Sequence, residues 1–235
     1  MKNPKKLLLL GASKRLGAHL ASYLSKDYSL FLQYRQNPNL LEALQKNLGK
    51  ERITLLKGDF STKEGVESFC GNIQHQTPEL DAILYTIGPY SFDSPLTAKI
   101  PVVENLLQLS LYAPLVILQK LTPLLEKTKG SFVSMGMCGL AVRQADIRTF
   151  SYTLSKNNLL LLTKSAALEL ASKNVRVNMV SPGYLFDTED LPKGKVPAKR
   201  LGTYEDIQEA VSFLLDPKNS YITGQNIEVA GGVRL

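Results

Sequence analysis

The segment Lys6-Leu-Leu-Leu-Leu-Gly-Ala-Ser-Lys-Arg-Leu-Gly17 decides the fold of this chain. It begins with a short apolar run, which is typical of a strand buried on both faces. Gly11 and Gly17 bound the turn that follows, and a helical pattern begins behind them. A strand, a glycine turn and a helix in this order present backbone N–H groups that can bind the pyrophosphate of a dinucleotide. An ordinary strand-to-helix turn would carry the same two glycines.

Short apolar runs alternate with longer helical patterns along the whole chain, as in βα units around a parallel sheet. We therefore predict one α/β domain over residues 1–235, with a doubly wound parallel sheet of about seven strands. The segment from about 184 to 200, rich in Pro, Lys and Gly, is expected to be a mobile loop over the substrate. The predicted strands are Lys6–Leu10, Ser29–Tyr34, Ile53–Lys57, Ala82–Thr86, Ser131–Met135, Val175–Val180 and Asn226–Val229.

Capping signals mark the start of two of the predicted helices. Ser61 is expected to cap one of them, with Glu64 completing a capping box. A second helix should begin near Thr203, where Asp206 places a negative charge in the first turn.

Two central helices, roughly Val102–Lys127 and Ser151–Lys173, are apolar around more than one stripe. Leu159 to Leu162 alone cover every direction of one turn. Such helices are buried on two sides, so one side should pack on the sheet. The other side should meet a second subunit, in a homodimer or homotetramer, or a covering loop.

Composition and charge exclude several classes of protein. With 44% hydrophobic and 21% charged residues, the chain is an ordinary globular protein and not a disordered or coiled-coil one. The 28 Lys and Arg against 21 Asp and Glu give a net charge of +7. These basic residues are scattered and form no aromatic-interleaved stripe, so we expect no nucleic-acid partner.

The ends and the cysteines point to the cytoplasm. The apolar run at the N-terminus stops at Gly11, which is too early for a signal peptide or a membrane span, so we expect no membrane partner. Cys70 and Cys138 lie far apart and lack His or Cys neighbours at metal-ligand spacing. We therefore expect neither a disulfide framework nor a metal site.

The stretch Tyr152-Thr-Leu-Ser-Lys156 lies at the start of a predicted helix. Its i, i+4 spacing places the phenol and the ammonium on one helix face. A nearby ammonium is expected to lower the pKa of Tyr152 towards working pH and to make the phenol a useful proton donor. Taken alone, this spacing is equally typical of a solvated helix face.

Together these motifs resemble the short-chain dehydrogenase/reductase family, from about Lys6 to the C-terminus. The further matches are Gly58-Asp59-Phe60, Tyr85-Thr-Ile-Gly88, Val177-Asn-Met-Val-Ser-Pro182-Gly183, Arg200-Leu-Gly-Thr-Tyr-Glu-Asp-Ile207, Tyr221-Ile-Thr-Gly-Gln225 and Ala230-Gly-Gly232. The resemblance implies a Rossmann fold and a small-molecule substrate that is oxidised or reduced by a nicotinamide cofactor.

The resemblance also implies roles for individual residues. Tyr152 would donate or take the proton, and Lys156 would hold the nicotinamide ribose. Asp59 and Phe60 would hold the adenine, Gly88 would lie beside the cofactor, and Pro182 and Gly183 would begin the loop that closes over the nicotinamide. The remaining residues implied in cofactor binding are Gly11, Ser13, Lys14, Arg15, Leu16, Gly17 and Arg35.

Departures from the family pattern concern the cofactor first. Arg15 stands where Gly is usual, and Lys14-Arg-Leu-Gly17 looks like the turn of pteridine reductases, which use NADPH. Arg35 ends the second strand where NAD-specific relatives carry an acid, so we expect NADP(H) as cofactor.

Other departures concern catalysis. Ser110 occupies the position of a catalytic Asn, and Met137 occupies that of the catalytic Ser, or of the Asp in pteridine reductases. A thioether cannot donate a hydrogen bond to a substrate. The alternatives are a loop that offers Ser134 or Cys138 instead, a site where Tyr152 works alone, or a substrate that needs no second donor.

The substrate is left open at this stage. Tyr90 stands where pteridine reductases sandwich the pterin, although a Tyr there can also merely cover a sheet edge. Met137, and Tyr184 after the sixth strand, are the other residues expected to contact the substrate. We predict an NADPH-dependent reductase of a small carbonyl or C=N compound, with a pteridine among the substrates considered. A 3-oxoacyl thioester reductase is the first alternative, and a weakly catalytic NADP-binding scaffold or sensor is the second.

Overall fold

The computed structural model describes residues 4–142, 145–188 and 196–233. Seven strands form one parallel sheet in the order β3-β2-β1-β4-β5-β6-β7. They are β1 (Lys5–Leu10), β2 (Tyr28–Tyr34), β3 (Ile53–Lys57), β4 (Ala82–Tyr85), β5 (Ser131–Met135), β6 (Arg176–Pro182) and β7 (Asn226–Val229). The predicted sheet is confirmed, with every predicted strand present and its ends shifted by no more than two residues.

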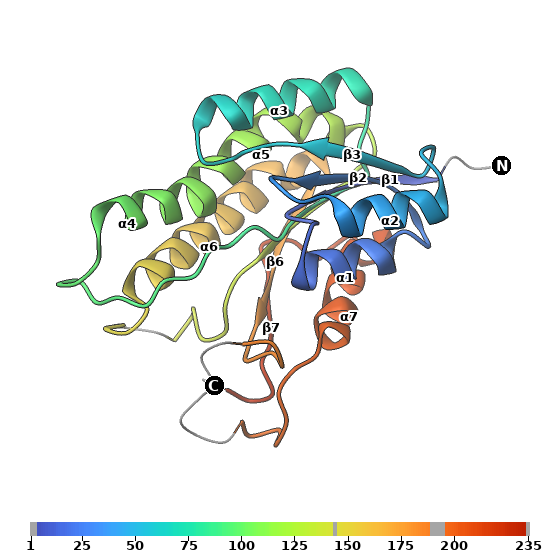
Figure 1. The fold of residues 1–235 in the computed structure, drawn as a ribbon. Helices are drawn as coiled ribbons and strands as arrows, with labels where there is room; N and C mark the ends of the chain where they lie inside the picture. Colours follow the sequence, from blue (N-terminus) through green and yellow to red (C-terminus); the bar gives the residue numbers. More distant parts are fainter. Residues whose placement is uncertain (1–3, 143–144, 189–195, 234–235) are drawn as a thin grey trace.

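Helices cover both faces of the sheet (Figure 1). Along β1, Leu8 and Leu10 enter one core while Leu7 and Leu9 enter the other, because successive strand side chains alternate between faces. One face carries α1 (Arg15–Leu24), α2 (Asn39–Leu48) and α7 (Tyr204–Leu215), and the other carries α3 (Lys63–Gln76), α4 (Ile100–Leu107), α5 (Ala113–Glu126) and α6 (Phe150–Leu170).

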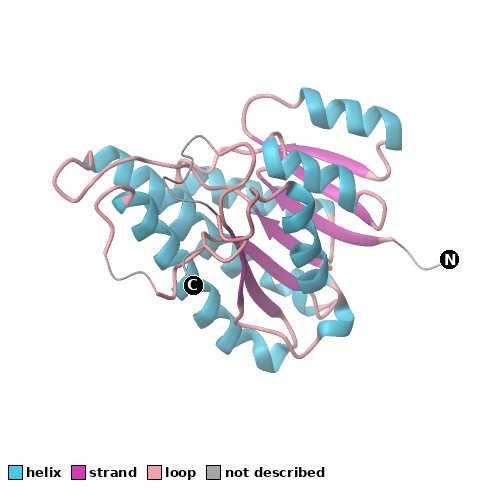
Figure 2. Ribbon diagram, turned by 90° about the horizontal axis from the view of Figure 1, so that it is seen from below, coloured by secondary structure: helices cyan, strands magenta, loops and turns pink. Residues whose placement is uncertain are grey.

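The chain order of the strands reverses between β1 and β4. In doubly wound sheets, ligands bind at this switch point, outside the carboxyl ends of the strands. Figure 2 shows the sheet between its helices with many loops gathered at one end. The fold therefore predicts where a ligand site lies before any side chain is considered.

The two central helices differ in how well the sequence predicted them. The segment expected as one helix over Val102–Lys127 is α4, a π-helical turn at Gln108–Tyr112, and α5. The π turn interrupts the regular hydrogen-bond ladder, which no apolar pattern reveals. The second expectation, Ser151–Lys173, is confirmed as α6 followed by a short 3-10 turn.

One capping prediction is wrong and the other is confirmed. Thr62, not Ser61, caps α3, and its hydroxyl accepts the N–H of Gly65 at 3.1 Å. The reason is that the Ser61 N–H is already bound to Asp59 at 3.0 Å, so the chain enters the helix one residue later. At α7, Thr203 and Asp206 form a capping box.

The apolar segment Ile100–Glu126 is long and apolar enough to cross a membrane by length and composition, with a mean hydropathy of 1.5. In the fold it is a helix of the core. Ile117, Leu121 and Leu125 are fully buried in α5, which packs against α3 and α6.

The second apolar side of α6 is exposed within the single chain. Leu161 is 65% exposed and Leu168 is 83% exposed, whereas Leu159 is fully buried. The expectation that both sides are covered is thus met on the sheet side only, and no loop of the described chain buries those two leucines.

Candidate active site

A cavity of about 1180 Å³ opens at the carboxyl ends of the strands. Its wall contains residues from the turn after each of the strands β1 to β6. Every predicted site residue lines it except Ser110. Segments as distant in sequence as the glycine turn, Tyr90, Met137 and Tyr184 therefore meet in one site, as the sequence predicted.

The glycine turn is held by a side chain that the sequence did not single out. The N–H of Gly11 donates to Gln33 Oε1 at 2.8 Å, and Gln33 Nε2 donates to the carbonyl of Gly58 at 2.6 Å. Gly11 has a φ of +87°, and a Cβ on Gly17 would lie 2.1 Å from the Gly11 carbonyl oxygen. The turn therefore requires both glycines.

The N-terminus of α1 is open towards the cavity. Its N-cap, Lys14, makes no side-chain capping bond, and the first turn contains no acid. Uncapped N–H groups, together with the cations of Lys14 and Arg15, form an anion-binding end. Arg15 itself adopts a left-handed φ of +48°, a conformation that favours glycine.

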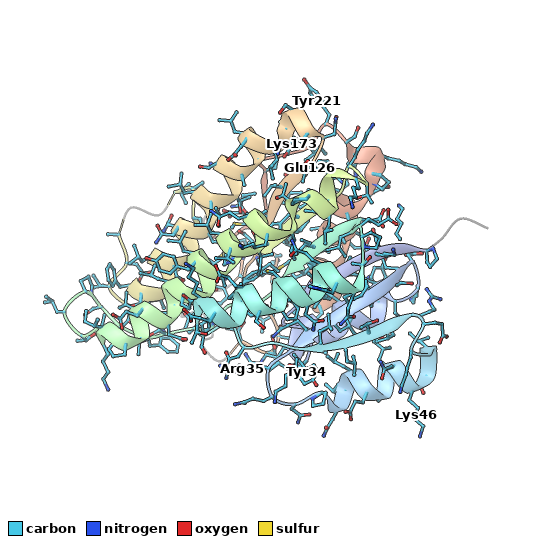
Figure 3. All side chains as sticks on the ribbon, turned by 90° about the horizontal axis from the view of Figure 1, so that it is seen from above. Tyr34, Arg35, Lys46, Glu126, Lys173 and Tyr221 are labelled. Carbon is cyan, nitrogen blue, oxygen red and sulfur yellow. The ribbon has the colours of Figure 1, made fainter. Side chains whose placement is uncertain are left out.

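The end of β2 carries a cation beside the cavity. Figure 3 shows Tyr34 and Arg35 together at this end of the strand, and both line the cavity. A backbone hydrogen bond from Ser61 lowers the pKa of Asp59, and Arg35 lowers it further. Phe60 is 2% exposed and its ring lies 5.1 Å from that of Phe69, so its ring packs into the core beneath the cavity floor.

The predicted catalytic pair lies in the middle of the wall. Lys156 Nζ donates to the carbonyl of Met135 at 2.8 Å and lies 5.7 Å from the centre of the Tyr152 ring. Burial lowers the pKa of Lys156 to about 8. A Cβ on Gly88 would lie 2.7 Å from Lys156 Nζ, so glycine at this position leaves room for the lysine head.

The prediction that Lys156 lowers the pKa of Tyr152 is wrong for the chain by itself. Burial raises the pKa of Tyr152, and nearby Tyr90 and Cys138 raise it further. The ammonium lies over the ring and is bound to a carbonyl, so the phenolate gains no direct partner. Tyr152 is therefore a protonated phenol at neutral pH.

Tyr90 forms part of an aromatic wall. Its ring centre lies 4.5 Å from that of Tyr152, with the planes at 50°, and 4.9 Å from that of Phe92. Tyr90 is 50% exposed and lines the cavity. A ring face that is exposed inside a cavity can receive a flat ligand.

Met137 and its neighbours on β5 and the following turn were the candidates for a second donor. Met137 lines the cavity, and its sulfur lies 4.0 Å from the hydroxyl of Thr153. Ser134 points away into the core, where its hydroxyl pairs with Thr163 at 3.2 Å, so it offers no substitute. Cys138 is buried but lines the cavity and remains a weak thiol donor.

Ser110 is the one predicted site residue that the structure does not bring to the wall. It is 1% exposed within the π turn, and only its neighbour Leu109 lines the cavity. The Ser110 hydroxyl has no hydrogen-bond partner among the residues that the structure describes. Burial within the π turn keeps Ser110 away from the cavity wall, and the match to a catalytic Asn position does not reveal this.

The loop after β6 approaches the glycine turn. Pro182, Gly183 and Tyr184 line the cavity, and an oxygen of Asp187 lies 3.8 Å from Arg15 Nε. The hydroxyl of Tyr204 also donates to Asp187. Residues 189–195 of the predicted loop lie outside the described part of the chain.

The arrangement fits a nicotinamide dinucleotide phosphate by the chemistry of its donors. The open N-terminus of α1 suits a pyrophosphate, and Arg35 suits a ribose phosphate. Lys156 is a buried cation in the same wall, with Nζ 5.7 Å from the centre of the Tyr152 ring. The wall thus offers anion binding at one end and a proton donor at the other.

Residues 11–234 match the family model described as Enoyl-(Acyl carrier protein) reductase. The chain therefore belongs to the short-chain dehydrogenase/reductase family and is an oxidoreductase. It is similar to the 3-oxoacyl-(acyl-carrier-protein) reductase FabG of Staphylococcus epidermidis, with 25% identity covering 97% of this chain and 98% of that protein.

Two solved structures share the fold. YwfH, described as an NADPH dependent reductase involved in bacilysin biosynthesis, superposes with a TM-score of 0.87, at 21% identity over 99% of each chain. RhlG of Pseudomonas aeruginosa, described as an NADP active-site complex, gives 0.86 at 20% identity, covering 98% of this chain and 96% of that one.

Proposed function

We propose that this chain is an NADPH-dependent reductase that transfers hydride to a flat carbonyl or C=N compound, the class to which pteridines belong. The observation that carries the proposal is the half-exposed Tyr90 ring, 4.5 Å from the ring of Tyr152. A flat substrate on this face gains about 0.5–1.5 kcal/mol beyond its burial. It also brings its reacting bond beside the phenol.

Tyr152 donates the proton in this reaction. The bound nicotinamide supplies the hydride. Because burial raises the pKa of Tyr152, the phenol holds its proton at neutral pH, which is the state that a general acid needs. The proton goes to the oxygen of a carbonyl or to the nitrogen of a C=N bond.

Met137 favours the C=N class within this proposal. Reduction of a ketone develops charge on oxygen, and that charge is stabilised by each donor aimed at it. Met137 supplies no such donor. Reduction of a C=N bond develops no alkoxide, so Tyr152 or a water can protonate nitrogen without a second donor.

The cofactor preference rests on Arg35. It directly follows β2 beside the cavity, with Lys14 and Arg15 in the same wall. We expect NADPH to bind more tightly than NADH, and Arg35→Ala to weaken NADPH about tenfold while leaving NADH unchanged. Fluorescence titration at moderate salt measures both; equal affinities in the unchanged protein would contradict the preference.

A 3-oxoacyl thioester reductase is the second candidate, favoured by the similarity to FabG over nearly the whole chain. NADPH oxidation with dihydrobiopterin, a quinone and an acetoacetyl thioester separates the two. Turnover of the flat compounds, reduced in Tyr90→Leu, supports the proposal. Brisk turnover of the thioester alone would overturn the flat-substrate proposal in favour of a 3-oxoacyl thioester reductase. NADPH binding without any turnover would support a scaffold or sensor instead.

We also propose that the chain forms a homodimer or homotetramer through the outer apolar side of its central helices. Leu161 and Leu168 of α6 and Ile100 of α4 are all more than half exposed in the single chain. Covering them removes apolar surface from water at about 25 cal/mol per Å². Light scattering behind size exclusion measures the assembly, and Leu168→Lys should shift it towards monomer.

A further inference from the structure

An aromatic path at the substrate end of the cavity leads from the proton donor to a cation. The ring centres of Tyr152 and Tyr90 are 4.5 Å apart, and those of Tyr90 and Phe92 are 4.9 Å apart. The guanidinium carbon of Arg148 lies 5.8 Å from the centre of the Phe92 ring. All four side chains line the cavity.

The backbone of Arg148 is fixed on both sides. Its N–H donates to Asp146 at 2.8 Å, and its carbonyl accepts the N–H of Asp93 at 3.0 Å. Asp93 in turn accepts the N–H of Ser151 at 2.8 Å, at the start of the helix that carries Tyr152. Arg148 therefore stands at a set position relative to Tyr152, unlike a cation on an unsupported loop.

The two carboxylates of this region accept hydrogen bonds from nearby groups. Asp146 accepts hydrogen bonds from the backbone N–H groups of residues 148 and 149 and from the hydroxyls of residues 149 and 153. Asp93 accepts from the N–H of Ser151 and from the hydroxyl of Ser91. These donors spread the negative charge of both groups, which reduces the repulsion that an anionic ligand would meet here.

Apolar side chains form much of the described part of this rim. Val142 is 61% exposed and Ile147 is 80% exposed, and both line the cavity. Phe92 is 54% exposed. A ligand at this end therefore meets apolar and aromatic surface along its body and a guanidinium at its outer end, a combination that suits a flat acid.

We propose that the substrate is a flat aromatic ring system whose reacting bond lies at Tyr152 and whose carboxylate pairs with Arg148. The reduction itself rests on the proposed function. In it, hydride adds to the carbon of the reacting C=O or C=N bond, the proton of Tyr152 goes to the oxygen or nitrogen of that bond, NADPH becomes NADP⁺, and the carboxylate is unchanged. Recognition of the anion by Arg148 is a separate property that binding alone can measure.

A matched pair of probes isolates the contribution of the ligand's carboxylate charge to binding. 6-Acetyl-2-naphthoate and 6-acetyl-2-naphthamide share the flat fused rings and the ketone and differ in the carboxylate. Calorimetric titration of the NADP⁺-loaded protein gives their dissociation constants, and NADPH oxidation gives kcat/KM separately. We expect the carboxylate to bind about tenfold more tightly than the amide, since a charge-assisted pair at a partly exposed site gives a gain of this order.

Substitutions of Arg148 test whether the tighter binding of the carboxylate comes from this side chain. Arg148→Gln should remove the tenfold difference by weakening the carboxylate alone. Arg148→Lys should keep part of it, because lysine retains the charge but not the planar fork. Lys46→Gln is the control: it removes the same charge from α2, outside the cavity wall (Figure 3), and should leave the difference intact.

The possible results separate this inference from the proposed function. Equal binding of the two probes, a difference that survives in Arg148→Gln, or no binding of either probe overturns the inference. If the carboxylate binds through Arg148 but is not reduced, the inference stands and the reductase proposal fails for aryl ketones. If both probes are reduced equally well and bound equally tightly, the reductase stands and the inference fails.

Discussion

The two ends of the cavity are built in different ways. At the cofactor end, Gln33 ties Gly11 to Gly58, and the open N-terminus of α1 presents backbone donors. At the other end, side chains from separate loops form the wall, among them Tyr90, Met137 and Tyr184. Backbone groups thus build much of one end of the cavity, while side chains build the other.

The largest expected effect follows from removing the proton donor at the substrate end. Tyr152→Phe keeps the ring and its contact with Tyr90 but removes the hydroxyl. We expect kcat to fall about 100-fold or more, because general acid catalysis contributes on this scale. Steady-state NADPH oxidation measures it, with the substrate that the panel identifies.

The Tyr152→Phe substitution should not affect the cofactor end of the cavity. NADPH should bind Tyr152→Phe with an unchanged dissociation constant, which fluorescence titration measures. Unchanged turnover in this variant would remove Tyr152 from the mechanism, and lost NADPH binding would show that the two ends are not separable.

The second effect concerns the lysine between the two ends. Burial lowers the pKa of Lys156 to about 8, whereas the unfolded chain keeps an ordinary lysine. Between these two pKa values the unfolded state binds more protons, so stability rises with pH there. The cost of burying the charge is full below pH 8 and disappears as the pH rises towards the unfolded value.

Lys156→Met removes this dependence. The free energy of unfolding of the unchanged protein, minus that of the variant, should therefore rise by about 2 kcal/mol between pH 7.5 and pH 10. Urea unfolding at several pH values measures both proteins, and the difference cancels the titration of all other groups. A flat difference would mean that Lys156 keeps its ordinary pKa in the folded chain.

The fold was predictable because each strand carries its own signal. Short segments rich in apolar residues, such as Ile53–Lys57 and Ser131–Met135, match the observed strands residue for residue. What the sequence did not reveal depends on tertiary bonds: the π turn at Gln108–Tyr112, and the bond from Ser61 to Asp59 that moves the cap to Thr62. Local sequence patterns predict neither the π turn nor the shifted cap.

The site was predictable where a motif fixes the backbone, as at Gly11 and at the Tyr152 turn. Direction of a side chain was harder to predict. Ser110 matched a family position yet ends in a buried pocket of the π turn, and the Tyr152 pKa moves opposite to expectation. Gln33 and Arg148 carry no motif, because their roles arise only from contacts with distant segments.

A hydroxyl donor can be restored at the substrate end by changing Met137. Met137→Ser should raise kcat for a ketone about tenfold, because it aims a hydroxyl at the developing oxygen charge. It should leave a C=N substrate nearly unchanged. Met137→Ala is the matched control for lost volume. Equal rates in the Ser and Ala variants would show that position 137 does not face the reacting oxygen.

The smallest effect tests the contrast between two helix ends at the cavity. The N-terminus of α1 has no side-chain cap, whereas α7 is closed by Thr203 and Asp206. A hydrogen bond from Arg200 holds the pKa of Asp206 well below its usual range, and the N–H of Thr203 adds to this.

Asp206→Ala should lower the free energy of unfolding by about 1 kcal/mol, the usual cost of a lost cap. Since the folded pKa is depressed, this contribution is fully present above the unfolded pKa near 4 and is lost progressively as the pH falls from there through the folded pKa. Urea unfolding should therefore show a smaller difference at pH 3 than at pH 7. NADPH binding should stay within twofold or so of the parent, because the ligand uses the open end of α1 and not the closed end of α7. An equally large loss at pH 3 would mean that Asp206 acts through packing and not through its charge.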